Sequence, residues 1–205
     1  PRRVGGGVRR RRGKAESPER RRRISGGTGG GGALVGAPGR PTRPTADGVR
    51  QARLDMVLHA PWGGRDCVEG RHVLDGLAGT GALGLEALSR GAAFCTFFET
   101  DRPALSALRT NIVGCQMGDI SRVHASSVLK APRASTPCHL IFLDPPYGKS
   151  LPSQALASLS THGWIAPGAL IVTETDREEA QPVEDVTILA ERTHGAARLW
   201  VWRAD

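Results

Sequence analysis

Short runs of consecutive apolar residues alternate along the chain with segments whose apolar residues recur at helical spacing. The clearest runs are residues 73–74, Phe94–Phe98, which contains Thr96, and residues 139–143, which begin with His139, and an acidic residue follows each. Mostly apolar runs of this kind are typical of strands in a parallel sheet that is covered on both faces. Strands that alternate with helices predict an α/β fold.

The helical spacing is clear in two places. Thr45 can cap a helix that continues through Val49, Ala52, Met56 and Val57 to about His59. Asp101 can cap a second helix with Pro103 in its first turn and an apolar stripe of Leu105, Leu108 and Ile112. Further helices are expected after Gly84 and over residues 151–160. The expected strands are residues 71–75, Phe94–Phe98, 121–125, 139–143, 169–174, 186–190 and 198–203, the last two as an antiparallel hairpin in which Trp200 and Trp202 pack on one face.

Charge divides the chain into parts. Residues 1–25 hold eleven basic and two acidic residues, whereas the remainder holds 17 basic and 18 acidic residues. The Arg- and Gly-rich start cannot bury enough apolar surface to order itself, although it could bind phosphates or simply be solvated. We therefore expect a disordered basic tail over residues 1–23, an extension of short strands and one helix over residues 24–69, and one α/β domain over residues 70–205.

The four cysteines contain no Cys-x-x-Cys pair, so neither a zinc site nor a disulfide framework is predicted. Isolated thiols suit a reducing compartment. The chain also has no run of eighteen apolar residues. These observations predict a soluble cytoplasmic protein that binds no metal and no membrane.

The run at residues 139–143 leads into Asp144, Pro145, Pro146 and Tyr147. Neither proline can donate to a strand ladder, so the strand stops there. Asp144 should then lie at the carboxyl edge of the sheet, where open α/β folds bind their ligands. An ordinary turn with a solvated aspartate would look the same in isolation.

A glycine-rich turn follows the expected strand at residues 71–75. Gly79, Gly81 and Gly84 form a dinucleotide-binding pattern, and Glu99 follows Gly79 by twenty residues. A dehydrogenase would place a pyrophosphate here and a ribose on Glu99. Asp75 favours S-adenosylmethionine instead, because a carboxylate beside the turn would repel pyrophosphate but can hold an amino group. A turn without a ligand is the third interpretation.

Several motifs together resemble the RsmD family of bacterial enzymes, which methylate N2 of one guanine in 16S ribosomal RNA. They are Arg43-Pro44-Thr45-x-Asp47-x-Val49-Arg50, the stretch from Gly79 to Ala92, Asp144-Pro145-Pro146-Tyr147 and Gly163-Trp164-Ile165. The resemblance implies a class I S-adenosylmethionine-dependent methyltransferase, with a Rossmann-like, mostly parallel, seven-stranded sheet and helices on both faces. It also implies a partner, 16S ribosomal RNA in a 30S subunit or assembly intermediate.

The resemblance assigns roles to particular residues. Asp144, Pro145, Pro146 and Tyr147 would be catalytic, with the aspartate and a proline carbonyl accepting the amine N–H groups and Tyr147 stacking on the base. Asp75, Gly79, Gly81, Glu99 and Ser126 would bind the cofactor, and Arg43, Thr45 and Arg50 the RNA. A DNA adenine or protein glutamine amino-methyltransferase shares the Pro-Pro-Tyr turn, and an inactive RNA-binding relative is the alternative that is not an enzyme.

The chain departs from the family pattern at a few positions. Gly29–Gly32 and Ala33 stand where relatives usually have a basic stretch, and Gly48 replaces an arginine. These changes weaken the expected RNA contact, and compensation by the Arg-rich tail is a hypothesis. Asp75, Glu99 and Asp144 are unaffected.

Overall fold

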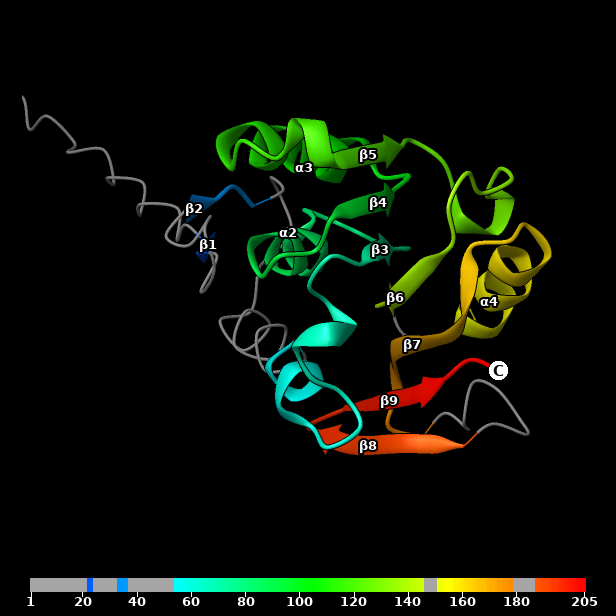
Figure 1. Ribbon diagram of the computed structural model, residues 1–205. Helices are drawn as coiled ribbons and strands as arrows, with labels where there is room; N and C mark the ends of the chain where they lie inside the picture. The colour runs from blue at the N-terminus through cyan, green and yellow to red at the C-terminus, as the bar shows by residue number, and fades with distance from the viewer. Residues whose placement is uncertain (1–21, 24–32, 37–53, 146–150, 179–186) are drawn as a thin grey trace, which may run out of the picture.

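The computed structural model describes residues 22–23, 33–36, 54–145, 151–178 and 187–205. Within these residues a seven-stranded sheet has the order β5-β4-β3-β6-β7-β9-β8 (Figure 1). The first five strands in this order are parallel, whereas β9 is antiparallel to both of its neighbours. The bounds are β3 His72–Asp75, β4 Phe94–Phe98, β5 Ser121–His124, β6 Cys138–Leu143, β7 Ile165–Asp176, β8 Ile188–His194 and β9 Ala197–Arg203. The mostly parallel seven-stranded sheet is thus confirmed.

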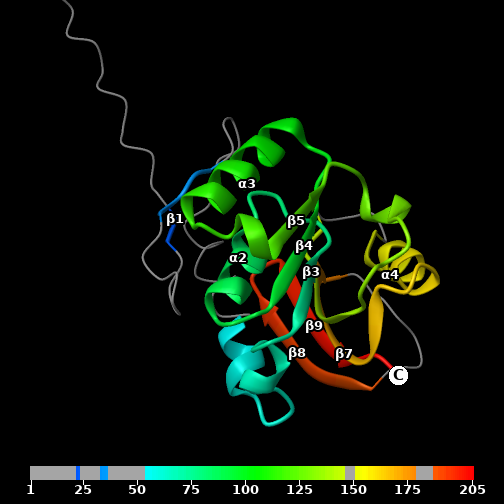
Figure 2. The ribbon, with the colours of Figure 1, turned by 45° about the horizontal axis from the view of Figure 1, so that its top comes forward.

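Helices cover both faces of this sheet (Figure 2). Helices α2 (Ala82–Ser89) and α3 (Arg102–Gly114) pack on one face, and α4 (Leu151–Thr161) packs on the other. Short 3₁₀ turns occur at η1 (Arg65–Cys67), η2 (Gly118–Ile120) and η3 (Val128–Lys130). No helix in the described ranges is both long and apolar enough to span a bilayer.

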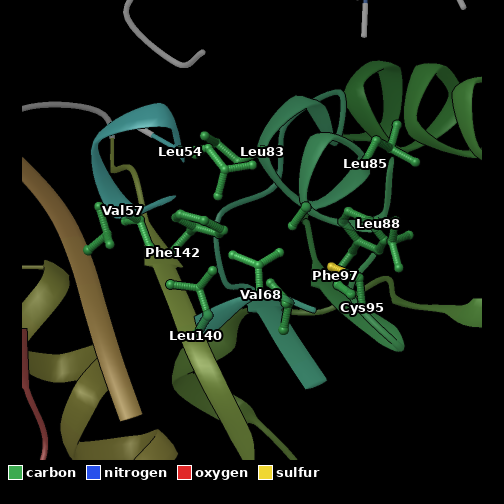
Figure 3. Packing of buried hydrophobic residues seen from close by; sticks show 14 of the residues in the cluster. Leu54, Val57, Val68, Leu83, Leu85, Leu88, Cys95, Phe97, Leu140 and Phe142 are labelled. Carbon is green, nitrogen blue, oxygen red and sulfur yellow. The ribbon is translucent and has the colours of Figure 1, made fainter. Parts of the chain in front are cut away.

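The alternation of strand side chains divides the core into two clusters. Leu140 and Phe142 of β6 join the cluster under α2 and α3, whereas Ile141 and Leu143 join the cluster under α4. Figure 3 shows the first cluster, in which Phe142 lies close to side chains of the helical segment at residues 54–59. Because successive side chains of a strand point to opposite faces, a fully apolar run is needed to fill both clusters.

The predicted helix ending near His59 is described from residue 54 onward. Its residues Leu54 and Val57 are fully buried. Asp55 forms an ion pair with Arg90 at 2.6 Å, and Arg90 also pairs with Glu86 of α2 at 2.8 Å. This half-buried arginine therefore ties the end of the extension to the helix that follows the glycine turn.

Two short strands precede this helix. Strand β1 (Arg22–Arg23) pairs antiparallel with β2 (Ala33–Leu34), and Leu34 is buried against the α2 and α3 cluster. Both views place β1 and β2 on the side of α2 and α3, away from α4 (Figures 1 and 2). Strand β2 lies in the extension, where short strands were expected, whereas β1 occupies the last two residues of the expected disordered tail.

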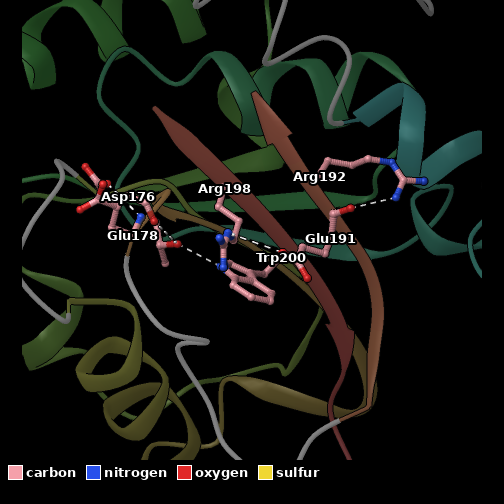
Figure 4. Close-up of polar contacts among 7 residues, drawn as sticks. Asp176, Glu178, Glu191, Arg192, Arg198 and Trp200 are labelled. Carbon is pink, nitrogen blue, oxygen red and sulfur yellow. Dashed lines mark hydrogen bonds and ion pairs between the residues drawn. The ribbon is translucent and has the colours of Figure 1, made fainter. Parts of the chain in front are cut away.

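The closing hairpin has the predicted pairing. Trp200 and Trp202 are 5% and 2% exposed, so they pack in the core as expected. Figure 4 shows polar contacts in the half of the hairpin nearer its turn, and Trp200 Nε1 donates to Thr175 Oγ1 at 2.9 Å. Arg198 lies over the Trp200 ring at 5.3 Å and pairs with Glu191 at 3.5 Å. The Trp200 bond joins β9 to β7, the strand beside β6, and the Arg198 ion pair joins β9 to β8.

Candidate active site

The glycine turn after β3 is shaped by two glycines for different reasons. Gly79 and Gly81 have φ of 56° and 83°, in the left-handed region that favours glycine. A Cβ at Gly79 would meet nothing within 4 Å, whereas a Cβ at Gly81 would lie 2.3 Å from Leu108 Cδ1 of α3. Gly79 therefore leaves open space beside the turn, and Gly81 allows α3 to pack directly against it.

Gly84, in the first turn of α2, allows this helix to pack closely against the sheet. A Cβ there would lie 2.3 Å from Phe97 Cε1 and 2.6 Å from Cys95 Sγ, both on β4. The helix can thus approach the sheet closely, which brings its first backbone N–H groups over the end of β3. The three glycines together set the shape of this turn.

Asp75 ends β3 and is 2% exposed. Its Oδ2 accepts from the Gly84 backbone N–H at 3.1 Å, a bond between the strand and the first turn of α2. A carboxylate is stabilised there by the free N–H groups of the helix start. Asp75 consequently braces the turn, a role that the sequence did not suggest, and its contact with a cofactor amino group stays a prediction.

Glu99 follows β4 and bonds three backbone N–H groups. Its Oε2 accepts from Gly79 N at 2.7 Å, and its Oε1 accepts from Thr100 N at 2.6 Å and Asp101 N at 2.7 Å. Asp101 in turn caps α3 by accepting from Ala104 N at 3.0 Å, as predicted. Glu99 and Gly79, twenty residues apart, are therefore in direct contact, whereas the ribose contact predicted for Glu99 stays a prediction.

Asp144 directly follows β6, the strand that neighbours β3 in the sheet. In the ladder Asp75 lies beside Phe142, and the Gly76 N–H donates to the Phe142 carbonyl at 2.9 Å. Thr173 of β7 donates its hydroxyl to the Leu143 carbonyl at 2.8 Å, a contact that the sequence did not suggest. The turn that carries Asp144 thus begins beside the glycine turn, and the last two residues of β6, Phe142 and Leu143, are bonded from the β3 and β7 sides respectively.

Asp144 is half-buried and Pro145 is buried. Pro146 and Tyr147 lie outside the described residues, as do Arg43, Thr45 and Arg50. The predicted catalytic and RNA-binding sets are therefore placed only through Asp144 and Pro145.

The loop after β5 forms the far side of the site. Ser126 is half-buried there, while the neighbouring Ser127 accepts from Leu129 N at 3.2 Å and so caps η3. His124 stacks on Phe98 with ring centroids 4.7 Å apart, and Trp164 meets Phe98 edge-on at 5.5 Å. Burial, and to a lesser degree Arg122, lowers the pKa of His124. The His124 ring belongs to an aromatic cluster with Phe98 and Trp164 that links β4 and β5 to the residue before β7.

The buried cysteine thiols are poorly suited to act as nucleophiles. Burial and the Asp75 charge raise the pKa of Cys95, and burial raises the pKa of Cys138 to about 12. All four cysteines are free, and no cluster of His, Cys, Asp and Glu that could hold a metal occurs in the described ranges. Thiols with raised pKa values stay protonated and are poor nucleophiles.

The comparison with known proteins decides the family. The family model described as "Conserved hypothetical protein 95" matches residues 22–203. A ribosomal RNA small subunit methyltransferase D of Haemophilus influenzae is 34% identical over 75% of this chain and 78% of the relative. The chain belongs to the RsmD family.

Two other relatives agree with this assignment. A ribosomal RNA small subunit methyltransferase D of Escherichia coli K12 is 35% identical over 68% of this chain and 67% of that protein. The solved structure of yhhF from Escherichia coli matches with a TM-score of 0.75 at 31% identity, covering 89% of this chain and 97% of that one. The fold is that of the class I methyltransferases.

Proposed function

We propose that this member of the RsmD family transfers a methyl group from S-adenosylmethionine to the N2 amine of a guanine in 16S ribosomal RNA. The observation that carries the proposal is the meeting of three strand ends at one edge of the sheet. There the glycine turn is bonded to Glu99 and begins beside the strand that delivers Asp144. The names of the Haemophilus and Escherichia relatives support a ribosomal RNA substrate.

The residues around the glycine turn suit S-adenosylmethionine. The space beside Gly79 admits a ligand close to the backbone, and the Glu99 carboxylate at its rim can accept from ribose hydroxyls. Asp75 would face the amino acid end, and Ser126 would contact the adenine. When bound, this cofactor supplies an electrophilic methyl group.

The protein's part in the reaction is to position the amine. The exocyclic nitrogen of guanine is a weak nucleophile because its lone pair is delocalised into the ring. Asp144 and the Pro145 carbonyl would accept hydrogen bonds from its two N–H groups, which would localise the lone pair and direct it at the methyl group of the cofactor. The bond from Thr173 to the Leu143 carbonyl, together with the fixed φ of the prolines, holds this pair of acceptors in place.

The substrate base must leave its stack to reach such a turn. Tyr147 would then stack on it, a contact worth about 1–3 kcal/mol per base. Arg43, Thr45 and Arg50 would hold the surrounding RNA, and residues 1–23 would add phosphate contacts that weaken with salt. In this organisation residues 24–69 form the RNA-binding extension and residues 70–205 the catalytic domain.

The proposal is tested by incubating the protein with methyl-labelled S-adenosylmethionine and 30S subunits from a strain that lacks this methylation. We expect label in N2-methylguanosine after digestion of the 16S RNA. Label in a ribosomal protein, or in adenine when DNA is supplied in place of the subunits, would favour another amino-methyltransferase, and no transfer would favour an inactive RNA-binding relative.

Asp144→Ala is the matched variant for this assay. We expect transfer to fall at least about a hundredfold, the scale of a misplaced reacting group. Affinity for S-adenosylhomocysteine should stay within about twofold, because the Glu99 and Gly79 contacts are unchanged. Full transfer by Asp144→Ala would refute its assignment as an acceptor of the amine.

A further inference from the structure

Asn111 is a buried amide in the last turns of α3, where the apolar stripe of Leu108 and Ile112 predicts core packing. Its side chain is 3% exposed. A buried amide without partners is costly, so each of its groups must be accounted for. They are used by two segments distant in sequence.

The first segment is the extension. Asn111 Oδ1 accepts from the Val35 backbone N–H at 2.6 Å, and Asn111 Nδ2 donates to the Val35 carbonyl at 3.1 Å. The amide thus pairs with both backbone groups of Val35 as a neighbouring strand would. Val35 follows the buried Leu34 of β2, so these bonds fix the end of that strand on α3.

The second segment is the glycine turn. Asn111 Nδ2 also donates to the Thr80 carbonyl at 3.0 Å. Thr80 lies between Gly79, which bonds Glu99, and Gly81, which packs on Leu108. One amide on a rigid helix therefore holds the cofactor turn and the extension together.

We propose that Asn111 is a positioning residue that couples cofactor binding at the glycine turn to the docking of the N-terminal extension. The inference rests on the proposed function, which places the cofactor at this turn and RNA contacts eight residues beyond Val35. A ligand that holds Thr80 in place strengthens the Asn111 contact with Val35. By linkage a docked extension then strengthens cofactor binding by the same factor.

The first test is amide hydrogen exchange of Val35 in the full chain, with and without saturating S-adenosylhomocysteine. We expect the ligand to slow exchange at Val35 at least about fivefold, the lower end of usual coupling strengths. The exposed loop glycine Gly70 serves as the internal reference, and its exchange should not change. Unaltered Val35 exchange in the saturated protein would overturn the proposal.

The second test is a double-mutant cycle read out by calorimetric titration with S-adenosylhomocysteine. Leu34→Ala loosens the extension, and Asn111→Leu removes the amide. We expect each to raise Kd at least about fivefold and the double variant to raise it no further, because both act through one connection. Thr110→Ala, at the neighbouring residue whose hydroxyl donates to the Ser106 carbonyl within α3, should match the wild type.

The outcomes separate this inference from the proposed function. Additive effects in the cycle, or an unchanged Kd in Leu34→Ala, would show that Asn111 only stabilises the fold. If Asn111→Leu does not fold, Asn111→Asp has the same size and replaces both Nδ2 donors with an acceptor. A wild-type chain that does not bind S-adenosylhomocysteine would instead refute the cofactor assignment.

Discussion

Replacement of Glu99 by alanine should weaken both the fold and the cofactor site. The carboxylate accepts three backbone N–H groups, of which those of Thr100 and Asp101 are exposed and can turn to water. The Gly79 N–H is partly buried, so its loss dominates. A hydrogen bond to a charged group contributes about 1.5–3 kcal/mol. For a domain of this size that lowers Tm by roughly 3–12 °C.

The same substitution removes the proposed acceptor for the ribose. Loss of one charged hydrogen bond of about 1.5–3 kcal/mol raises Kd at least about tenfold. We would measure Tm by calorimetry and the Kd for S-adenosylhomocysteine well below the melting range. Glu69→Ala is the control, since Glu69 is exposed and pairs only with the exposed Arg65 in the described residues. A lowered Tm with unchanged Kd would refute the ribose role, and a raised Kd with unchanged Tm would refute the bracing of the turn.

Three further substitutions test the surroundings of the site. Gly81→Ala places a Cβ 2.3 Å from Leu108 Cδ1 and should cost about 1–3 kcal/mol in urea unfolding, whereas Gly114→Ala, with open space, should not. His124 has a pKa below 6.5 in the folded protein, so the unfolded chain binds its proton more readily and stability falls as pH drops below about 6.5. In His124→Phe this loss of stability at low pH should be smaller, and a pH profile identical to that of the wild type would refute the pKa shift. Trp200→Phe removes the buried bond to Thr175 and should cost about 0.5–1.5 kcal/mol, measured by the same unfolding experiment.

The sequence predicted those parts of the fold that depend on local patterns. Residues 139–143 were expected as a buried strand and form β6, Cys138–Leu143, because a fully apolar run can only be satisfied between two covered faces. Strand β7 begins at Ile165, four residues before the expected start. Pro167 and Gly168 concealed it: Gly168 has φ of 71°, and its carbonyl accepts from Arg203 of β9, so a tertiary contact replaces the missing local preference.

The candidate site likewise contains residues that local patterns brought out and one residue whose contacts they did not reveal. The spacing of Glu99 and Gly79 indicated one shared edge of the sheet, because the ends of adjacent parallel strands meet there, but it did not predict the bond between them. Asn111 could not, since its partners Val35 and Thr80 are 76 and 31 residues away and their backbone groups leave no trace in sequence. Its one signal is a polar residue within an apolar helical stripe, which is also seen at ordinary helix surfaces.

Two carboxylates hold the glycine turn, one at Gly84 and one at Gly79, and this limits how a ribose can bind. Asp75 bonds the Gly84 N–H and Glu99 bonds the Gly79 N–H, so the turn is ordered by the protein itself and little further ordering is needed on binding. A carboxylate has about four acceptor positions, and Glu99 uses three. Two ribose hydroxyls therefore need one position that is now occupied. The exposed Thr100 N–H is the donor that water can satisfy, whereas release of Gly79 would free the turn, so Glu99 should keep its bond to Gly79 and yield the one to Thr100.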